Sequence, residues 1–160
     1  MISIGINIEH VFNQVNMRTL YIADQIDPSL AELMADKIPL TEDDRSYFKI
    51  ALRDACVKLA LLLSPLTKGV STPFQIDEEN GFVYYNIDEN RSGHNTSLLE
   101  TVLPGLIMRA LMLWIVCEWL RLKGINAMYY AAESSEYETV RLEIRNLTKQ
   151  KKAKLNSNWY

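Results

Sequence analysis

The side chains that most often carry out metal or acid–base chemistry are few in this sequence and lie far apart. The two histidines, His10 and His94, have no Cys, His, Asp or Glu partner at a spacing typical of metal ligands. His94 lies in the polar stretch 91–95, so we expect a solvated loop residue. The sequence therefore predicts neither a metal centre nor a histidine-based active site.

Carboxylates occur as two adjacent pairs, Asp43-Asp44 and Glu78-Glu79. Adjacent positions of a helix do not converge on one site, which disfavours paired acid–base catalysis. The first pair is explained by the start of a helix, where the helix dipole favours negative charge. The second pair is explained by a solvated turn.

The two cysteines, Cys56 and Cys117, lie within apolar helical patterns, which predicts two buried thiols. The six glycines do not cluster, and no phosphate loop, nucleophile elbow or dinucleotide fingerprint is present. The sequence therefore predicts a protein that is not an enzyme and needs no cofactor. A hydrophobic content of 48% and a net charge of −3 disfavour both disorder and a broad nucleic-acid surface.

The first residues, MISIGINI, alternate isoleucine with small or polar residues. This period of two predicts a strand or an extended arm that buries one face on a neighbour. The expected contact residues are Ile2, Ile4, Ile6 and Ile8. From residue 9 the spacing becomes helical, with Leu20 among the residues expected on the apolar face, and the helix ends before Asp27-Pro28. A short helix is expected at 29–37.

Thr41, followed by three carboxylates, is a typical N-cap, and apolar residues then recur at helical spacing until Ser64-Pro65. Strands are expected at about 73–77 and 82–87, joined by a turn that contains Asn80-Gly81. This hairpin would form an insertion at about 70–93.

A long helix is expected from about 96 to 123, where Gly124 ends it. A last helix is expected from about 126 to 148, with Met128 among its apolar residues. The long helix is apolar around most of its circumference, so it needs cover on all sides, which makes an oligomer attractive. It is long enough to cross a membrane, but Glu100, Arg109 and Glu118 favour a helix buried in a core or between subunits.

The residues after 148 form a basic stretch that ends in two aromatics, and aromatic residues are frequent interface anchors. We expect an arm that binds a neighbour through Lys149, Lys151, Lys152, Lys154, Trp159 and Tyr160. The overall prediction is a mainly α fold. It is a helical bundle (9–148) with one long central helix, a small β-hairpin at about 73–87 and extended arms at 1–8 and 149–160.

This layout resembles the helical head-to-tail connector proteins of tailed bacteriophages, especially phages of Bacteroides-type gut bacteria. The similar stretches are 1–15 (MISIGINIEHVFNQV), 41–55 (TEDDRSYFKIALRDA), 107–122 (IMRALMLWIVCEWLRL) and 131–152. The resemblance implies a homo-oligomeric ring, often twelve-fold, in the neck or tail of the virion. Before assembly such a protein would lie in the host cytoplasm.

The resemblance also implies that the ring contacts the portal and adjacent tail ring proteins, that the terminal arms reach these neighbours, and that DNA passes without specific binding. The lysine-rich stretch ending in Trp-Tyr departs from the arginine-rich ends usual in these proteins, which leaves the arm's partner open. Two alternatives remain at this stage. One is a soluble helical adaptor that binds a single protein through the groove beside the long helix, and the other is a nucleic-acid module that uses the basic stretch.

Overall fold

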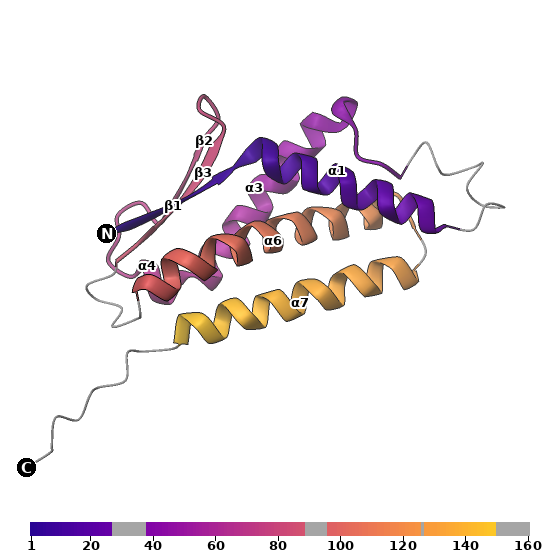
Figure 1. Ribbon diagram of the computed structural model, residues 1–160. Coiled ribbons are helices and arrows are strands. Elements are labelled where there is room, and N and C mark those ends of the chain that lie inside the picture. The colour runs from indigo at the N-terminus through magenta and orange to yellow at the C-terminus, as the bar shows by residue number, and fades with distance from the viewer. Residues whose placement is uncertain (27–37, 89–95, 126, 150–160) are drawn as a thin grey trace, which may run out of the picture.

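The computed structural model describes residues 1–26, 38–88, 96–125 and 127–149, and these are mainly helical, as predicted (Figure 1). Four longer helices and a small antiparallel sheet surround a shared core. In chain order the elements are β1 (Ile2–Asn7), α1 (Ile8–Gln25), the 3₁₀ turn η1 (Glu42–Asp44), α3 (Arg45–Leu62), α4 (Ser64–Thr67), β2 (Phe74–Asp77), β3 (Phe82–Ile87), α6 (Thr96–Leu122) and α7 (Ala127–Lys149).

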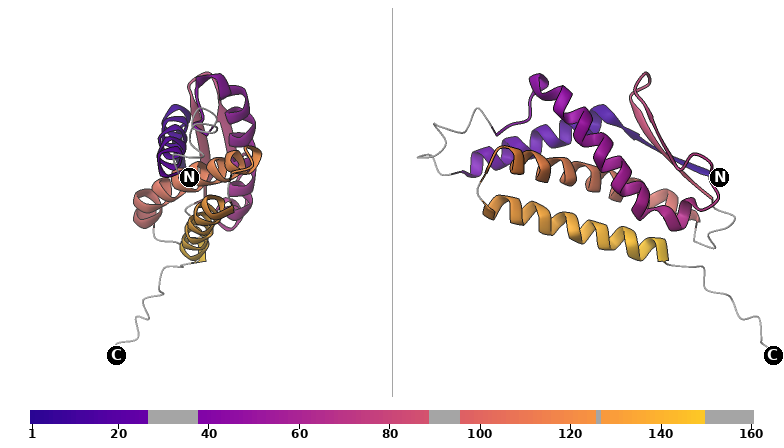
Figure 2. Two further views of the ribbon diagram at one scale, coloured as in Figure 1. Left: turned by 90° about the vertical axis from the view of Figure 1, so that its right-hand side faces the viewer. Right: turned by 180° about the vertical axis from the view of Figure 1, so that it is seen from behind.

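The long helix α6 is the centre of the fold, and α1, α3, α7 and β1 all pack against it (Figures 1 and 2). Leu103, Ile107, Leu113 and Ile115, on several sides of the helix, are 0% exposed. By length and hydropathy alone this helix could span a membrane. The apolar circumference of this helix made an oligomer attractive, but the chain itself supplies cover from several directions.

Helix α1 begins at a capped end, where the side-chain Oδ1 of Asn7 accepts a hydrogen bond from the His10 N–H at 2.8 Å. It ends at Gln25, just before Asp27-Pro28, as predicted. The predicted inward position of Leu20 is wrong, because Leu20 is 43% exposed and Thr19 is buried instead. The Thr19 hydroxyl accepts the Leu40 N–H at 3.0 Å, which satisfies both groups inside the core.

The start of α3 follows the predicted chemistry. Thr41 and Asp44 form a reciprocal capping box, with the Thr41 N–H donating to the Asp44 carboxylate at 2.9 Å. The far end differs slightly from the prediction. Ser64-Pro65 does end α3, but Pro65 lies in the first turn of the short helix α4, where its missing N–H costs nothing.

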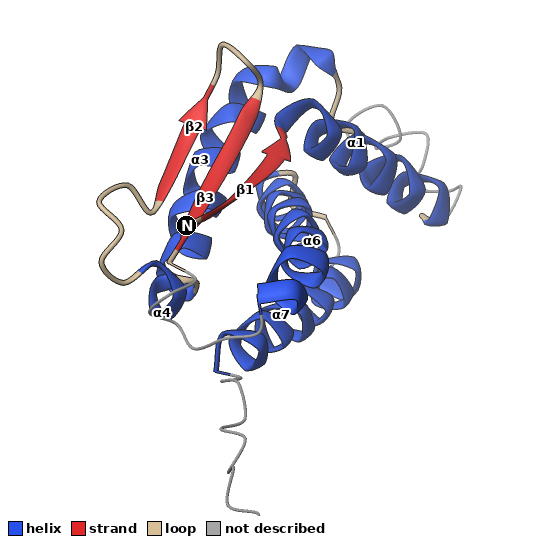
Figure 3. Ribbon diagram, turned by 60° about the vertical axis from the view of Figure 1, so that its left-hand side comes forward, coloured by secondary structure: helices blue, strands red, loops and turns tan. Residues whose placement is uncertain are grey.

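The predicted hairpin is confirmed as β2 and β3, and a third strand, β1, joins it to give the order β1-β3-β2 (Figure 3). Ile4 pairs with Tyr85 and Ile6 with Val83, and both isoleucines are at most 5% exposed. The N-terminal strand is therefore as predicted, but the free arm is not. Residues 2–7 complete a sheet of their own domain, with Ile4 and Ile6 in its core.

Gly5 lies where β1 passes close to an aromatic side chain of the outer sheet face. A Cβ atom at this position would lie 3.1 Å from Cε1 of Tyr84. The absence of a side chain lets the Tyr84 ring lean over β1, beside the parallel ring of Phe82, whose centroid is 5.8 Å away. Packing of the Tyr84 ring thus explains the small residue at position 5 of the alternating pattern.

Helix α7 matches the predicted last helix, but its polar side is partly buried. Glu133 is 5% exposed and accepts hydrogen bonds from Arg18 of α1 at 3.0 and 3.1 Å. Glu136 binds both Arg18 and Arg109 of α6, each through a contact of 2.9 Å or less. These two arginines and two glutamates link α1, α6 and α7. The network therefore fixes α1 and α7, two of the helices that cover α6, in their positions against it.

Three predicted features fall outside the described residues. They are the short helix at 29–37, most of the polar loop after Asp88, and the basic stretch from residue 150 onward. Met128 of α7, predicted on the apolar side of its helix, is 64% exposed.

Candidate protein-interaction site

Chemistry-bearing side chains stay dispersed in the folded domain. Among residues 1–26, 38–88, 96–125 and 127–149, no group of three or more His, Cys, Asp or Glu side chains could hold a metal ion. His10 is exposed on the first turn of α1, and His94 lies outside the described residues. The adjacent carboxylates Asp43 and Asp44 lie at the start of α3, as their spacing predicted.

The two thiols are buried in separate helices, as predicted. Burial raises the pKa of Cys56 to about 11, and burial together with the nearby Glu133 and Glu118 raises the pKa of Cys117 to about 12. A nucleophilic cysteine needs the opposite shift, towards the thiolate at neutral pH. These residues therefore act as small apolar core side chains.

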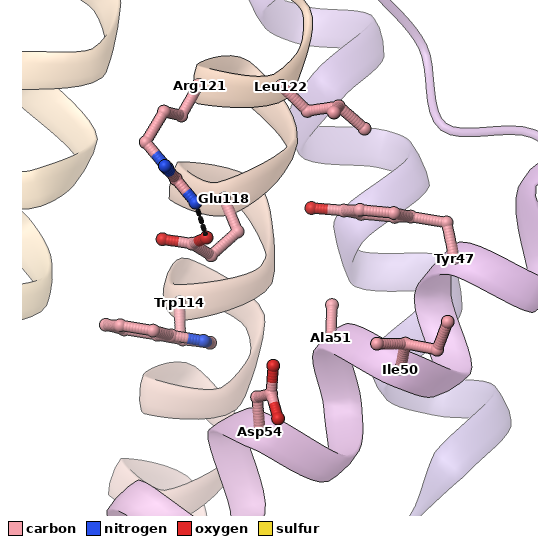
Figure 4. Close-up of a pocket in the computed structure, with 8 residues that line it drawn as sticks. All are labelled: Tyr47, Ile50, Ala51, Asp54, Trp114, Glu118, Arg121 and Leu122. Atoms are coloured by element: carbon pink, nitrogen blue, oxygen red, sulfur yellow. Dashed lines mark hydrogen bonds and ion pairs between the residues drawn. The ribbon is translucent and has the colours of Figure 1, made fainter.

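One hollow lies between α3 and the C-terminal half of α6, and its volume is about 370 Å³ (Figure 4). Tyr47 and Asp54 reach it from α3, and Trp114 and Glu118 reach it from α6. Its walls combine aromatic rings and aliphatic carbons with a few polar tips. The remaining lining residues are Ile50, Ala51, Arg121 and Leu122.

The polar groups that line this hollow can form hydrogen bonds with a bound partner. Arg121 donates to Glu118 at 2.6 Å, whereas Asp54 forms no ion pair within the described residues. The Trp114 Nε1–H is buried and has no hydrogen-bond partner among the residues that the structure describes. Burial, with a further contribution from Glu118, raises the pKa of Tyr47, so its hydroxyl stays protonated. The hollow thus combines hydrogen-bond donors with the carboxylates of Asp54 and Glu118.

A second hollow of about 540 Å³ continues on the other side of Trp114, between α3 and α7. The Lys58 ammonium lies 4.5 Å from the centre of one Trp114 ring, and the Tyr137 ring centroid is 5.5 Å away. Trp114 thus forms a ridge shared by the two hollows. We call the two hollows together the Trp114 groove.

The outward side of α3 carries a row of exposed apolar residues beside this groove. Ile50 is 65% exposed, Val57 44% and Leu61 71%, and Asp54 occupies the intervening turn. We call Ile50, Asp54, Val57 and Leu61 the α3 stripe. Its spacing of four, three and four residues places all four on one side of a helix. Neighbouring exposed apolar residues of this kind are typical of protein-binding surfaces.

Sequence reasoning missed the α3 stripe because the same helix has a stronger apolar face. Phe48, Leu52, Ala55 and Leu59 accounted for the core contacts, and the lysines and arginines between them indicated a solvated second face. The signal was present in the spacing of Ile50, Val57 and Leu61. Periodicity alone does not say how wide the buried face is, so it could not show that these three residues lie outside it.

The residues predicted to bind partners are not brought together by the fold. Ile2 and Ile8 are half-buried and pack against the core that contains Ile4 and Ile6, so none of the four lies on a free arm. Lys149 is exposed at the end of α7, far along the chain from β1. The other predicted contacts, Lys151, Lys152, Lys154, Trp159 and Tyr160, lie outside the described residues.

Comparison of the chain with protein-family models, with curated protein sequences and with solved structures gave no match.

Proposed function

We propose that this protein is a structural protein that forms a ring in the head-to-tail connector of a tailed bacteriophage. The ring would extend the channel through which DNA leaves the head. The observation that carries the proposal is the α3 stripe. It exposes Ile50, Val57 and Leu61, which the domain does not use in its own core.

The α3 stripe supports assembly because exposed apolar surface gains free energy when another protein covers it. Burying one large aliphatic side chain completely contributes roughly 1.5–3 kcal/mol. The three exposed side chains, already partly covered, can together contribute a few kcal/mol per contact. A closed ring repeats that contact at every subunit boundary, so weak individual contacts give a stable assembly.

The domain core also suits a repeated structural unit. Helix α6 is covered by its own chain, so the monomer can fold before it meets its neighbours. The long helix therefore does not need neighbouring subunits for its cover, although its apolar circumference favours an oligomer. Assembly would instead depend on surfaces that are separate from the core.

A soluble adaptor that binds one protein is the second candidate, and the Trp114 groove favours it. A groove lined by Trp114, Tyr47 and Tyr137 resembles the aromatic-rich centres of many protein interfaces. Such an adaptor would form a discrete complex with its partner and no ring.

The oligomeric state of the full chain tests the proposal. We expect light scattering to show a large species whose mass rises with concentration, and negative-stain images to show rings, alone or on a portal complex. Replacing Ile50 and Leu61 by glutamate should abolish this species because charge would enter the contact.

The matched control is Leu142→Glu, since Leu142 is 54% exposed on α7 and lies outside the α3 stripe. Circular dichroism should show that both variants remain folded. A chain that stays monomeric alone and with portal complexes would contradict the ring, and a single heterodimer with one protein would support the adaptor.

A further inference from the structure

A second apolar surface lies on the outward side of α1. Met17 is 63% exposed, Leu20 43% and Tyr21 58%, although the intervening Thr19 and the following Ile22 are buried. We call Met17, Leu20 and Tyr21 the α1 stripe. A shallow hollow of about 230 Å³ lies beside it, and Met112 of α6 forms part of its wall. Methionine side chains adapt readily to the shape of a partner.

The α1 and α3 stripes lie on opposite sides of the domain. The inner faces of the two helices meet at Phe12 and Phe48, whose rings pack edge to face at 5.1 Å. The side view shows α1 and α3 at opposite edges of the domain (Figure 2). One molecule therefore presents two unlike apolar surfaces in roughly opposite directions.

The spacing of the two stripes is compatible with direct helix pairing. In α1, exposed residues recur at Asn13, Met17, Leu20 and Asp24, and in α3 at Ile50, Asp54, Val57 and Leu61. Both series follow steps of four, three and four residues, the pattern of a left-handed helix pair. Side chains of one stripe can then enter the spaces between side chains of the other.

Charge favours pairing of unlike stripes. The α3 stripe is flanked by Arg53 and Lys58, and by Lys49, which pairs with Glu78 at 3.6 Å, and Asp54 is the only acid among these exposed positions of the helix. Two α3 stripes facing each other would bring these cations together. The corresponding side of α1 carries the exposed acid Asp24, and its one arginine, Arg18, is already neutralised by Glu133 and Glu136. An α1 stripe therefore meets an α3 stripe without accumulating like charge.

We infer that the α1 stripe of one copy packs on the α3 stripe of the next copy, with the exposed side chains of α3 seated against the hollow beside Met17. This inference rests on the proposed function and names the contact through which the protein would assemble. Such a contact uses different surfaces on its two partners. It therefore repeats from copy to copy, and it ends only when the chain of subunits closes into a ring.

Two variants that each lose one stripe test the pairing. The first carries Ile50→Glu and Leu61→Glu, and the second carries Met17→Glu and Tyr21→Glu. Each variant alone should be monomeric, with association weakened at least about thirtyfold. Mixed in equal amounts, they should form a dimer and nothing larger, because the intact α1 stripe of the first variant can still bind the intact α3 stripe of the second.

Disulfide trapping provides a second measurement that does not depend on glutamate substitutions. A chain with Leu61→Cys, mixed with a chain with Met17→Cys and oxidised, should give a covalent heterodimer. The native cysteines are buried and should remain reduced. Leu142→Cys in place of Leu61→Cys is the control and should give little product.

The outcomes separate this contact from the ring itself. If the variant with Met17→Glu and Tyr21→Glu assembles like the unmodified chain, the pairing is overturned but the ring is not. A dimer formed by the second variant alone would show that α3 pairs with α3, which also overturns it. Open filaments of the unmodified chain, with the expected dimer in the mixture, would support the pairing and contradict the ring. An unmodified chain that is monomeric at every concentration would overturn the pairing, and the portal experiment would then test the connector role separately.

Discussion

Helix α6 and the α3 stripe are both rich in apolar side chains, but they differ in what covers them. Ile107 and Leu111 of α6 are at most 1% exposed, because three helices and a strand surround them. Ile50 and Leu61 of α3 are more than 60% exposed, because no described element lies over that side of the helix.

The difference separates stability from assembly in this molecule. The apolar residues of α6 stabilise the monomer, since they leave water when the chain folds. Those of the α3 stripe leave water only if another protein covers them. An apolar helix is therefore not in itself a sign of oligomerisation. The sign is an apolar surface that stays exposed to water after the chain has folded.

The largest expected effect comes from a cavity in the covered helix. Ile107→Ala should lower the free energy of unfolding by about 2–5 kcal/mol, because Ile107 is fully buried and its neighbours cannot fill the space. Urea denaturation followed by circular dichroism measures this change. A loss below about 1 kcal/mol would mean that α6 is less tightly enclosed than its burial indicates.

A smaller change in the free energy of unfolding should appear at alkaline pH, and it should come from Cys117 of the same helix. Its pKa is raised to about 12 in the fold, from an ordinary value of 9. Between these values the unfolded chain loses the thiol proton and the folded chain keeps it, so stability falls as pH rises. The slope is up to about 1.4 kcal/mol per pH unit.

Urea denaturation between pH 8 and pH 11 checks this slope against a Cys117→Ala variant. The variant should lose stability less steeply than the unmodified chain, because it lacks the thiol that ionises on unfolding. Equal slopes in the two proteins would indicate that Cys117 is accessible to water in the folded state.

The smallest expected effect on folding is at the α3 stripe. Leu61→Ala should change the free energy of unfolding of the monomer by less than about 0.5 kcal/mol, because Leu61 is 71% exposed. Leu59→Ala, two residues away and 5% exposed, is the matched control and should cost about 2–5 kcal/mol. Similar losses at the two positions would erase the distinction between the core side and the outer side of α3.

Local patterns were sufficient to predict most elements. The Thr41 cap, the hairpin around Asn80-Gly81 and the end of α6 at Gly124 depend on chemistry within a few residues, and all three are present in the structure. The period of two in β1 was also read correctly. Its pairing with β3 joins residues about eighty positions apart, and no local signal specified that partner.

The candidate site was the less predictable part. The predicted contact residues lie in the two terminal segments, 1–8 and 149–160. No sequence pattern indicated that the isoleucines of the first segment or the aromatic residues of the second pack into the core. Ile4 and Ile6 do join the core, and the exposed apolar residues are instead on the middle of α1 and α3. Leu20 and Thr19 show the reason, since which of two adjacent residues faces inward depends on how the helix is rotated against its neighbours.

The sequence by itself determined where most of the described helices and strands begin and end, because caps, turns and periodicity act over short distances. It also determined that both cysteines would be buried within apolar segments. The tertiary structure alone decided which apolar residues would be covered, because burial depends on the elements that happen to pack nearby. In the folded domain α6 is enclosed, β1 is paired in a sheet, and the α1 and α3 stripes remain exposed on opposite sides.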